Sequence, residues 1–366
     1  MPCKNDTIRQ DPPTERIHHS IGSGIAVGCD ANLAEEETLR AELPRWDRWR
    51  VCASVSRALA RLLVEVQVVE FQRILCPTDF SDISRHALEH AIVIGRWYGS
   101  QITAVHVGHQ MILLGTAAAA PPAAGEMLPD EPNRQRLEEQ VREWLAPAAA
   151  AGLQTHVIVD AGNPARCILE HARTSSANLI VIGTHGQSGF ERLVLGSVAE
   201  KVLRKASCPV MTVPPHASGA SRLPFAHVLC AIDFSESSIV ALQFAFSLAQ
   251  ESNARLTLLH VFEWPSDEAA ARRVLEASEF HRQWQIEKRL QLEGLIPANV
   301  RNWCAPEPKL AFGRAYQQIL NLAASEQVDV IVMGVRGRNP IDLMLFGSTT
   351  NHVVRQAACP VLTLRG

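Results

Sequence analysis

Short apolar runs alternate along the chain with longer stretches whose apolar residues recur every three or four positions. Runs such as 73–77 and 179–182 predict buried strands, and stretches such as 81–94 predict amphipathic helices. Strands that are apolar almost throughout, each followed by a helix, are typical of a parallel sheet covered on both faces. The pattern therefore predicts an α/β fold built on doubly wound, five-stranded parallel sheets. In the first part of the chain, strands are predicted at 73–77, 101–107, 155–160, 179–182 and 210–213, and helices at 81–94, 132–146, 163–174 and 197–205.

The same pattern occurs twice along the chain. Residues 71–81 (FQRILCPTDFS) match 225–235 (FAHVLCAIDFS), and residues 208–213 (CPVMTV) match 359–364 (CPVLTL). The offset between equivalent residues is 154 at the first match and 151 at the second, so the first copy holds three additional residues in its middle. Self-similarity over this length predicts two tandem copies of one domain.

The repeat divides the chain into three parts. Domains are predicted at 70–214 and 222–366, with a short linker rich in Pro, Ser and Gly between them. Residues 1–69 have no counterpart in either copy, and their polar, glycine-punctuated start predicts a partly disordered N-terminal extension. The copies differ in one connection, which is an Ala/Pro-rich loop at 109–130 in the first and a charged helix at about 267–293 in the second.

Each copy carries three glycines and a serine in the pattern Gly-x2-Gly-x9-Gly-Ser, directly after its fourth predicted strand. Glycine allows the backbone to approach an anion closely, and the free N–H groups at a helix start favour negative charge. A strand that ends in such a turn and leads into a helix predicts a phosphate-binding loop. The residues concerned are Gly183, Gly186, Gly196 and Ser197 in the first copy, and Gly334, Gly337, Gly347 and Ser348 in the second.

Two further positions repeat at strand ends. Asp79 and Asp233 follow the first strand of each copy, and Val107 and Val261 end the second strand. Ligands of doubly wound sheets bind beyond the carboxyl ends of the strands. A carboxylate there can accept hydrogen bonds from ribose hydroxyls or from the adenine amino group, and peptide groups near the valines can contact an adenine edge. Together with the glycine turns, these positions predict adenine nucleotide sites. His106 and His260, which lie among apolar strand residues, are expected to be packed and hydrogen-bonded rather than catalytic.

Composition narrows the functional classes. The net charge is −3, and no basic run is interleaved with aromatic residues, which argues against nucleic acid and anionic membranes as partners. The nine cysteines include no CxxC pair, and their odd number fits reduced thiols better than a disulfide framework. The apolar window at 51–71 is interrupted by charged residues, and the N-terminus lacks the apolar core of a signal peptide. A cytoplasmic location is expected.

These motifs resemble the universal stress protein family, whose signature is Gly-x2-Gly-x9-Gly-Ser/Thr with an aspartate after the first strand. The segments GTHGQSG (183–189), LGSV (195–198) and CPV (208–210) are similar to family sequences, and the likeness covers about residues 70–366. The resemblance implies a Rossmann-like, adenine nucleotide alpha hydrolase-like fold with strand order 3-2-1-4-5. It also implies dimerisation through the last strand, which the two halves could satisfy within one chain as a pseudo-dimer, with or without a further homodimer.

The resemblance implies that ATP, with Mg²⁺ as a possible companion, is the ligand. Its contacts would fall on Asp79, Val107, Gly183, Gly186, Gly196 and Ser197 in the first half, and on Asp233, Val261, Gly334, Gly337, Gly347 and Ser348 in the second.

The two sites need not bind alike, because Arg336, Arg338 and Pro340 stand in the second loop where the first has His185, Gln187 and Gly189. Neither copy has the Gly-Lys-Ser/Thr of a P-loop, and no general base is evident, so an adenine-nucleotide-sensing module in the stress response is favoured over an enzyme. Two alternatives stay open: an interaction protein with vestigial sites that works through its dimer surfaces, and a slow nucleotide hydrolase.

Overall fold

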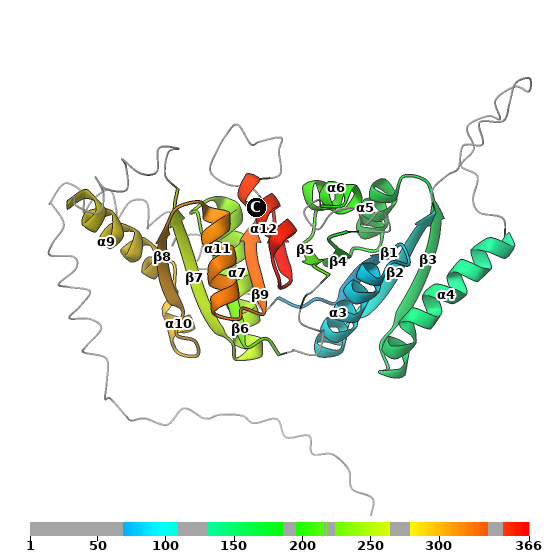
Figure 1. Cartoon of the computed structure of the whole chain (residues 1–366). Helices are drawn as coiled ribbons and strands as arrows, with labels where there is room; N and C mark the ends of the chain where they lie inside the picture. Colours follow the sequence, from blue (N-terminus) through cyan, green and yellow to red (C-terminus); the bar gives the residue numbers. More distant parts are fainter. Residues whose placement is uncertain are drawn as a thin grey trace, which may run out of the picture. The chain divides into compact units, whose positions relative to one another are not determined.

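The computed structural model describes residues 69–108, 131–185, 195–215, 217, 224–263, 279–335 and 347–365. The predicted N-terminal extension, the loop at 109–130 and the centres of both glycine loops lie outside these residues. The first half (Figure 1) consists of β1 (Arg73–Thr78), α3 (Asp82–Tyr98), β2 (Gln101–Gly108), α4 (Glu131–Ala150), β3 (Thr155–Ala161), α5 (Pro164–Thr174), β4 (Leu179–Gly183), α6 (Ser197–Lys205) and β5 (Val210–Val213).

The second half repeats this order and adds one short helix. It consists of β6 (His227–Ala231), α7 (Glu236–Ser252), β7 (Arg255–Phe262), α9 (Glu279–Gly294), α10 (Ala298–Arg301), β8 (Glu307–Phe312), α11 (Ala315–Ser325), β9 (Val330–Gly334), α12 (Ser348–Gln356) and β10 (Val361–Leu364). The charged helix predicted at 267–293 corresponds to α9, and residues 264–278 lie outside the described part.

The ten strands of the described residues belong to one sheet, in the order β3-β2-β1-β4-β5-β10-β9-β6-β7-β8. Within each half the neighbours are parallel and follow the order 3-2-1-4-5, so the predicted tandem, doubly wound α/β fold is confirmed. The halves join through an antiparallel pair in which Val361, Leu362 and Thr363 of β10 face Thr212, Met211 and Val210 of β5.

The helix boundaries follow from capping residues. Ser81 caps α3 and accepts a hydrogen bond from the amide of Ser84, as predicted for a serine that precedes an apolar periodic stretch. Asn163 caps α5 and Pro164 occupies its first turn, which confirms the start predicted there. The predicted end of α4 at 146 is too early, because the helix includes Pro147 and continues to Ala150.

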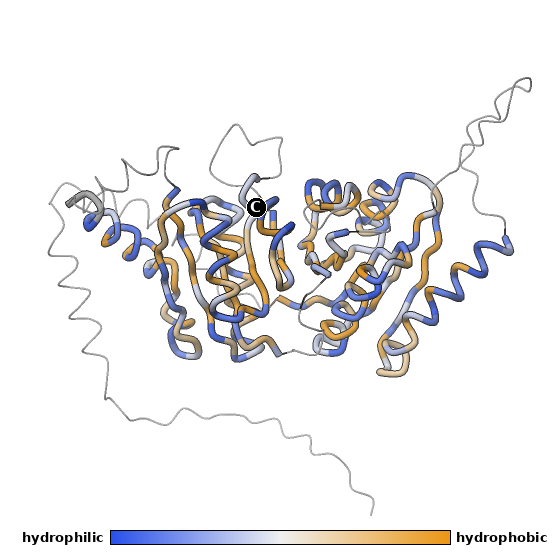
Figure 2. Tube along the Cα trace, in the orientation of Figure 1, coloured by the Kyte–Doolittle hydropathy of each residue, from blue (hydrophilic) through white to orange (hydrophobic). Residues whose placement is uncertain are grey.

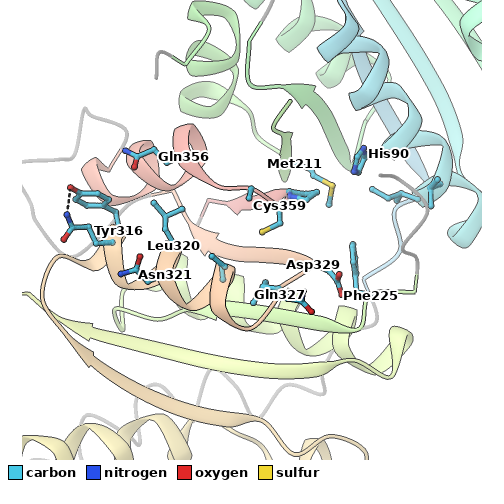
Figure 3. Close-up of a pocket in the computed structure, with 18 residues that line it drawn as sticks. His90, Met211, Phe225, Tyr316, Leu320, Asn321, Gln327, Asp329, Gln356 and Cys359 are labelled. Carbon is cyan, nitrogen blue, oxygen red and sulfur yellow. Dashed lines mark hydrogen bonds between the residues drawn. The ribbon is translucent and has the colours of Figure 1, made fainter. Parts of the chain in front are cut away.

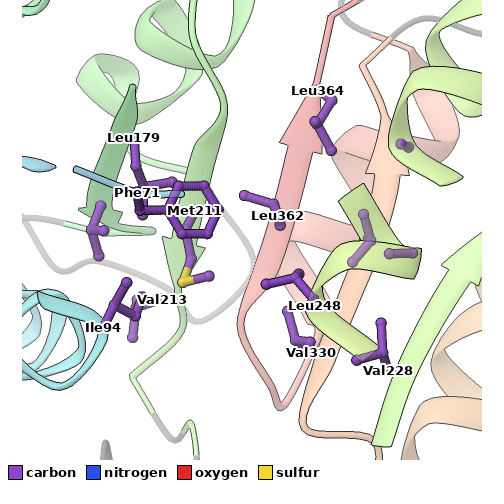
Figure 4. Packing of buried hydrophobic residues seen from close by; sticks show 14 of the residues in the cluster. Phe71, Ile94, Leu179, Met211, Val213, Val228, Leu248, Val330, Leu362 and Leu364 are labelled. Atoms are coloured by element: carbon purple, nitrogen blue, oxygen red, sulfur yellow. The ribbon is translucent and has the colours of Figure 1, made fainter. Parts of the chain in front are cut away.

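Alternate side chains of the strands enter two apolar layers. Ile74 and Cys76 of β1 pack in one cluster under α3, α4 and α7, while Leu75 packs in another under α5, α6, α11 and α12. The apolar residues are concentrated in the strands, whereas α4 and α9 are largely hydrophilic (Figure 2). The first cluster is continuous across the two halves, because Met211 and Leu362 face each other at the antiparallel pair (Figure 4).

No helix among the described residues is both long and apolar enough to cross a membrane.

Candidate functional site

The predicted contact residues of the first half gather at one edge of the sheet. Strands β2, β1 and β4 are parallel neighbours, so their carboxyl ends lie side by side. Asp79 follows β1, Val107 is next to last in β2, and Gly183 ends β4. Gly196 caps α6 and Ser197 is its first residue, exposed to solvent. Of the six predicted residues of this half, Gly186 lies outside the described part of the chain.

The second half places the equivalent residues in the same way. Asp233 follows β6, Val261 is next to last in β7, and Gly334 ends β9. Gly347 caps α12, and the exposed Ser348 begins it. Gly337 and the loop residues that distinguish this half in the sequence, Arg336, Arg338 and Pro340, lie outside the described residues.

Both aspartates are tied to the start of the helix that follows. Oδ1 of Asp79 accepts hydrogen bonds from the amide of Ser81 at 3.0 Å and from its hydroxyl at 2.6 Å. Oδ1 of Asp233 accepts one from the amide of Ser235 at 2.9 Å. Each aspartate therefore supports a helix cap, and this contact also fixes the position of a carboxylate at the strand end.

A phenylalanine between aspartate and serine has an unusual backbone in both halves. Phe80 has φ 62° and Phe234 has φ 63°, a left-handed conformation that is uncommon for bulky side chains. Their rings pack on His106 and His260, with centroid distances of 4.5 and 4.8 Å. Residues with strained backbone conformations cluster at functional sites, and here the same conformation recurs at the carboxyl ends of the first strand of both halves. The repeated Asp-Phe-Ser triplet was the sequence signal for it.

Each histidine ring is fixed by a backbone carbonyl. Nδ1 of His106 lies 2.9 Å from the oxygen of Thr78, and Nδ1 of His260 lies 2.7 Å from the oxygen of Ile232. Because a carbonyl only accepts, Nδ1 carries the proton in both rings. The expectation of packed, hydrogen-bonded histidines is confirmed.

The glycines that end β4 and β9 are required by close packing. A Cβ atom at Gly183 would lie 2.7 Å from Cγ2 of Ile83, in the first turn of α3. A Cβ atom at Gly334 would lie 2.5 Å from Oγ of Ser237 and 2.8 Å from its carbonyl carbon, in the first turn of α7. These glycines therefore let a helix start approach the strand end, which brings the helix and the glycine turn to the same place.

The glycines that cap α6 and α12 make backbone contacts. The amide of Gly196 donates to the oxygen of Thr184 at 2.9 Å, and the amide of Gly347 donates to the oxygen of Val335 at 3.2 Å. These bonds close each glycine loop at its base, so the two ends of the loop are held together next to the strand end.

A carboxylate–histidine pair lies beside Val107 in the first half. Asp160 faces Val107 across β3 and β2, its Oδ2 lies 2.8 Å from Nε2 of His171, and its Oδ1 accepts the Ala161 amide at 2.7 Å. Burial acts to raise the pKa of Asp160, but the hydrogen bonds from His171 and from the Ala161 amide outweigh it and hold this pKa below its ordinary value.

Asp160 was not among the predicted contact residues, although it ends a strand-like run much as Asp79 follows one. Its equivalent in the second half is Ala311, which faces Val261, and the equivalent of His171 is Leu322, at the common offset of 151 residues. The polar pair is therefore confined to the first half.

Because the pKa of Asp160 is lowered by folding, its contribution to stability is present at neutral pH and is lost as the pH falls from about 4 through the folded-state value. We expect Asp160→Asn to unfold more readily than the wild type at pH 7, by less than about 1 kcal/mol because the pair is partly exposed. The difference should vanish near pH 2. Urea titrations of both proteins across this range measure it, and a difference that does not depend on pH would contradict the assignment.

The second half carries aromatic rings at two strand ends where the first half has small residues. Phe262 and Phe312 stand at the ends of β7 and β8, and Trp284 of α9 packs on both, with ring centroids at 4.8 and 4.9 Å. The equivalent positions at the ends of β2 and β3 are Gly108 and Ala161. The strand ends of the two halves therefore present different surfaces.

A pocket of about 710 Å³ lies away from the predicted contacts (Figure 3). Its lining includes His90 of α3, Met211 of β5, Tyr316 and Leu320 of α11, and Cys359 before β10, but none of the twelve predicted nucleotide contacts. Burial raises the pKa of Cys359 to about 12, which disfavours the nucleophilic thiolate at neutral pH. Among the described residues, no group of three or more His, Cys, Asp or Glu side chains could hold a metal ion.

The strand order and the two glycine turns at strand ends define a tandem, Rossmann-like α/β protein with two candidate ligand sites. The sequence profile of the universal stress protein family matches residues 70–214 and 224–365, so the chain belongs to that family. It is 27% identical to a universal stress protein of Mycolicibacterium smegmatis. The match extends over 300 residues, which are 80% of this chain and 96% of that protein.

Two further proteins illustrate the likeness. A universal stress protein of Methanocaldococcus jannaschii is 35% identical over 146 residues, which is 39% of this chain and 82% of the relative. The crystal structure of a universal stress protein from Archaeoglobus fulgidus is similar in fold, with a TM-score of 0.57 and 24% identity over 81% of this chain and 99% of that one.

Proposed function

We propose that this universal stress protein binds ATP in its first half and acts in the stress response as a nucleotide-sensing interaction module. The observation that carries the proposal is the meeting of Asp79, Val107, Gly183, Gly196 and Ser197 at one sheet edge, where β1 and β4 diverge into helices. That divergence is the switch point at which doubly wound sheets bind ligands. The Asp79 carboxylate would accept hydrogen bonds from the ribose hydroxyls, and the backbone of β2 would contact adenine. The start of α6 would face the phosphates, with Mg²⁺ as their counter-ion.

The first half is the favoured site because of its side chains. It keeps small residues at the ends of β2 and β3 and a polar pair, Asp160 and His171, beside Val107. The second half has Phe262 and Phe312 at the same strand ends and no such pair. Its own site, at Asp233, Val261, Gly334, Gly347 and Ser348, is the weaker candidate for ATP.

Binding is favoured over hydrolysis. The Asp79 carboxylate already supports a helix cap, and neither repeat supplies the P-loop lysine that grips the β- and γ-phosphates in efficient NTPases. A protein that holds ATP without turning it over rapidly is suited to signal nucleotide levels through its surfaces. The six described cysteines are free thiols, which fits the proposed cytoplasmic location.

Isothermal titration of the full chain with ATP tests the proposal. We expect Asp79→Asn to weaken ATP binding about tenfold, because a hydrogen bond to a charged group contributes about 1.5–3 kcal/mol and the amide retains part of it. The amide oxygen can still accept from Ser81, so the helix cap is preserved. Asp233→Asn is the matched control in the second half and should leave the affinity of the first-half site for ATP unchanged.

The absence of any heat with ATP, ADP or AMP, with and without Mg²⁺, would exclude the proposal and favour an interaction protein with vestigial sites. Equal losses in the two variants would place comparable sites in both halves. Release of phosphate at rates abolished in Asp79→Asn would instead identify a hydrolase.

A further inference from the structure

Two buried nitrogen atoms without hydrogen-bond partners lie near the glycine turn of the first half. They are Nε2 of His185, which follows Gly183 and Thr184 after β4, and Nε of Arg355, in the last turn of α12. The other two such atoms among the described residues are oxygens of Glu251 and Glu326, whose second oxygens are bonded. Buried polar atoms are normally paired. Nε of Arg355 always carries a proton and therefore lacks an acceptor, and Nε2 of His185 lacks one in the tautomer whose Nδ1 accepts from the hydroxyl of Thr184.

The antiparallel strand pair brings the segments that carry these residues close to each other. The amide of Thr184 donates to the oxygen of Val213, at the end of β5, at 3.1 Å. The neighbouring Thr212 faces Val361, the first residue of β10, and α12 ends five residues earlier. The positive charge of Arg355 acts on the His185 ring. Burial lowers the pKa of His185, and the charge of Arg355 lowers this pKa further. A cation of the second half therefore lies within electrostatic range of His185, at the start of the glycine turn of the first half.

The charge of Arg355 is not balanced by a carboxylate among the described residues. In α6, the equivalent Arg204 pairs with Glu200 one turn earlier, at 3.7 Å. The residue one turn before Arg355 is Asn351, which stands at the position equivalent to Glu200. The repeat therefore keeps the arginine in both helices but keeps its acidic partner only in α6.

An anion at the glycine turn would supply what both nitrogens lack. Nδ1 of His185 lies 2.9 Å from Oγ1 of Thr184, and when it accepts the hydrogen bond of that hydroxyl, Nε2 carries the ring proton and can donate it to an anion. A guanidinium presents its N–H groups as a planar fork that matches phosphate oxygens. We propose that Arg355 of the second half, together with His185, binds the phosphates of a nucleotide held by the first half. This inference rests on the proposed function.

The second half would then contribute a residue to the ligand site of the first half, as a neighbouring subunit does in an oligomer. Its own strand ends carry aromatic rings, and its last helix contributes a cation to the other site. Occupancy of that site would be sensed directly at the junction between the halves, because the phosphates would bridge α12 and the turn after β4.

Titrations of the full chain with ATP and with adenosine test this arrangement. We expect Arg355→Gln to weaken ATP binding about tenfold and to leave adenosine binding unchanged, because only the phosphates reach the guanidinium. Asn351→Glu restores the acidic partner present in α6 and should weaken ATP binding in the same direction without removing the arginine. Arg204→Gln is the matched control and should have no effect on either ligand at the first site.

The outcomes separate the inference from the proposed function. If the wild type binds neither ATP nor adenosine, the proposed function fails and the inference fails with it. If the wild type binds both but Arg355→Gln and Asn351→Glu keep its preference for ATP over adenosine, the inference alone is overturned. The inference would also be overturned if Arg355→Gln bound neither ligand while Asn351→Glu bound ATP as the wild type does. The loss in Arg355→Gln would then come from damage to the fold and not from a missing phosphate contact.

Discussion

Replacing Gly334 with alanine is expected to lower the free energy of unfolding by about 3 kcal/mol, at the upper end of the usual cost of overpacking. The new Cβ would lie 2.5 Å from Oγ, 2.8 Å from the carbonyl carbon and 2.9 Å from Cβ of Ser237. Two of these three atoms belong to the backbone or lie next to it, so α7 itself would have to move. Urea denaturation followed by circular dichroism measures the loss.

The glycines at other strand ends provide graded controls. Gly183→Ala should cost less, because only the Cγ2 methyl of Ile83 lies closer than 3.0 Å. Gly108→Ala should be close to neutral, because its Cβ would meet only the oxygen of Asp160, at 3.8 Å. If all three variants lost the same stability, the close approach of α7 to β9 would not be the reason for the glycine.

This geometry changes the meaning of the repeated glycine pattern. In the sequence, Gly183 and Gly334 belong to a predicted phosphate-binding pattern, and in the structure they also meet a packing requirement that exists without any ligand. A glycine that recurs in both repeats can meet a ligand-binding requirement and a packing requirement at once, and the sequence does not distinguish the two. The distinction needs the positions of Ile83 and Ser237 in space, which depend on how the following helix crosses the sheet.

Local patterns predicted the elements well because each strand and helix is encoded within its own stretch of chain. Apolar runs marked β1 and β4, and the caps Ser81 and Asn163 marked two helix starts. Contacts between distant segments could not be predicted in this way. The packing of Trp284 on Phe262 and Phe312 depends on the placement of α9 over two strand ends, which no local pattern contains.

The candidate site shows the same division. The strand-end residues of the first-half site followed from the repeat, whereas the proposed contact of Arg355 was not predicted, because Arg355 belongs to the other half of the chain. A signal was nevertheless present in the sequence, since Glu200 is replaced by Asn351 while the arginine four residues later is retained. The two halves are therefore similar in fold and different in the chemistry of their strand ends.

Phe246→Ala is expected to destabilise the protein by about 3–5 kcal/mol, the usual cost of removing a buried aromatic side chain. Phe246 lies in α7, is fully buried, and belongs to the core cluster that runs across both halves. The equivalent residue of the first half is Ile92, so Phe246→Ile is the matched control; it leaves a smaller cavity and should cost substantially less.

The same variant tests whether the two halves unfold together. Because Met211 and Leu362 join their cores at the antiparallel pair, we expect a single transition, monitored by circular dichroism and tryptophan fluorescence, that shifts as a whole in Phe246→Ala. A second transition that keeps its wild-type midpoint would show that the first half folds independently of the second. In that case the β5–β10 pair would be a contact between separate domains, and any coupling of the halves would have to come from a ligand that bridges them.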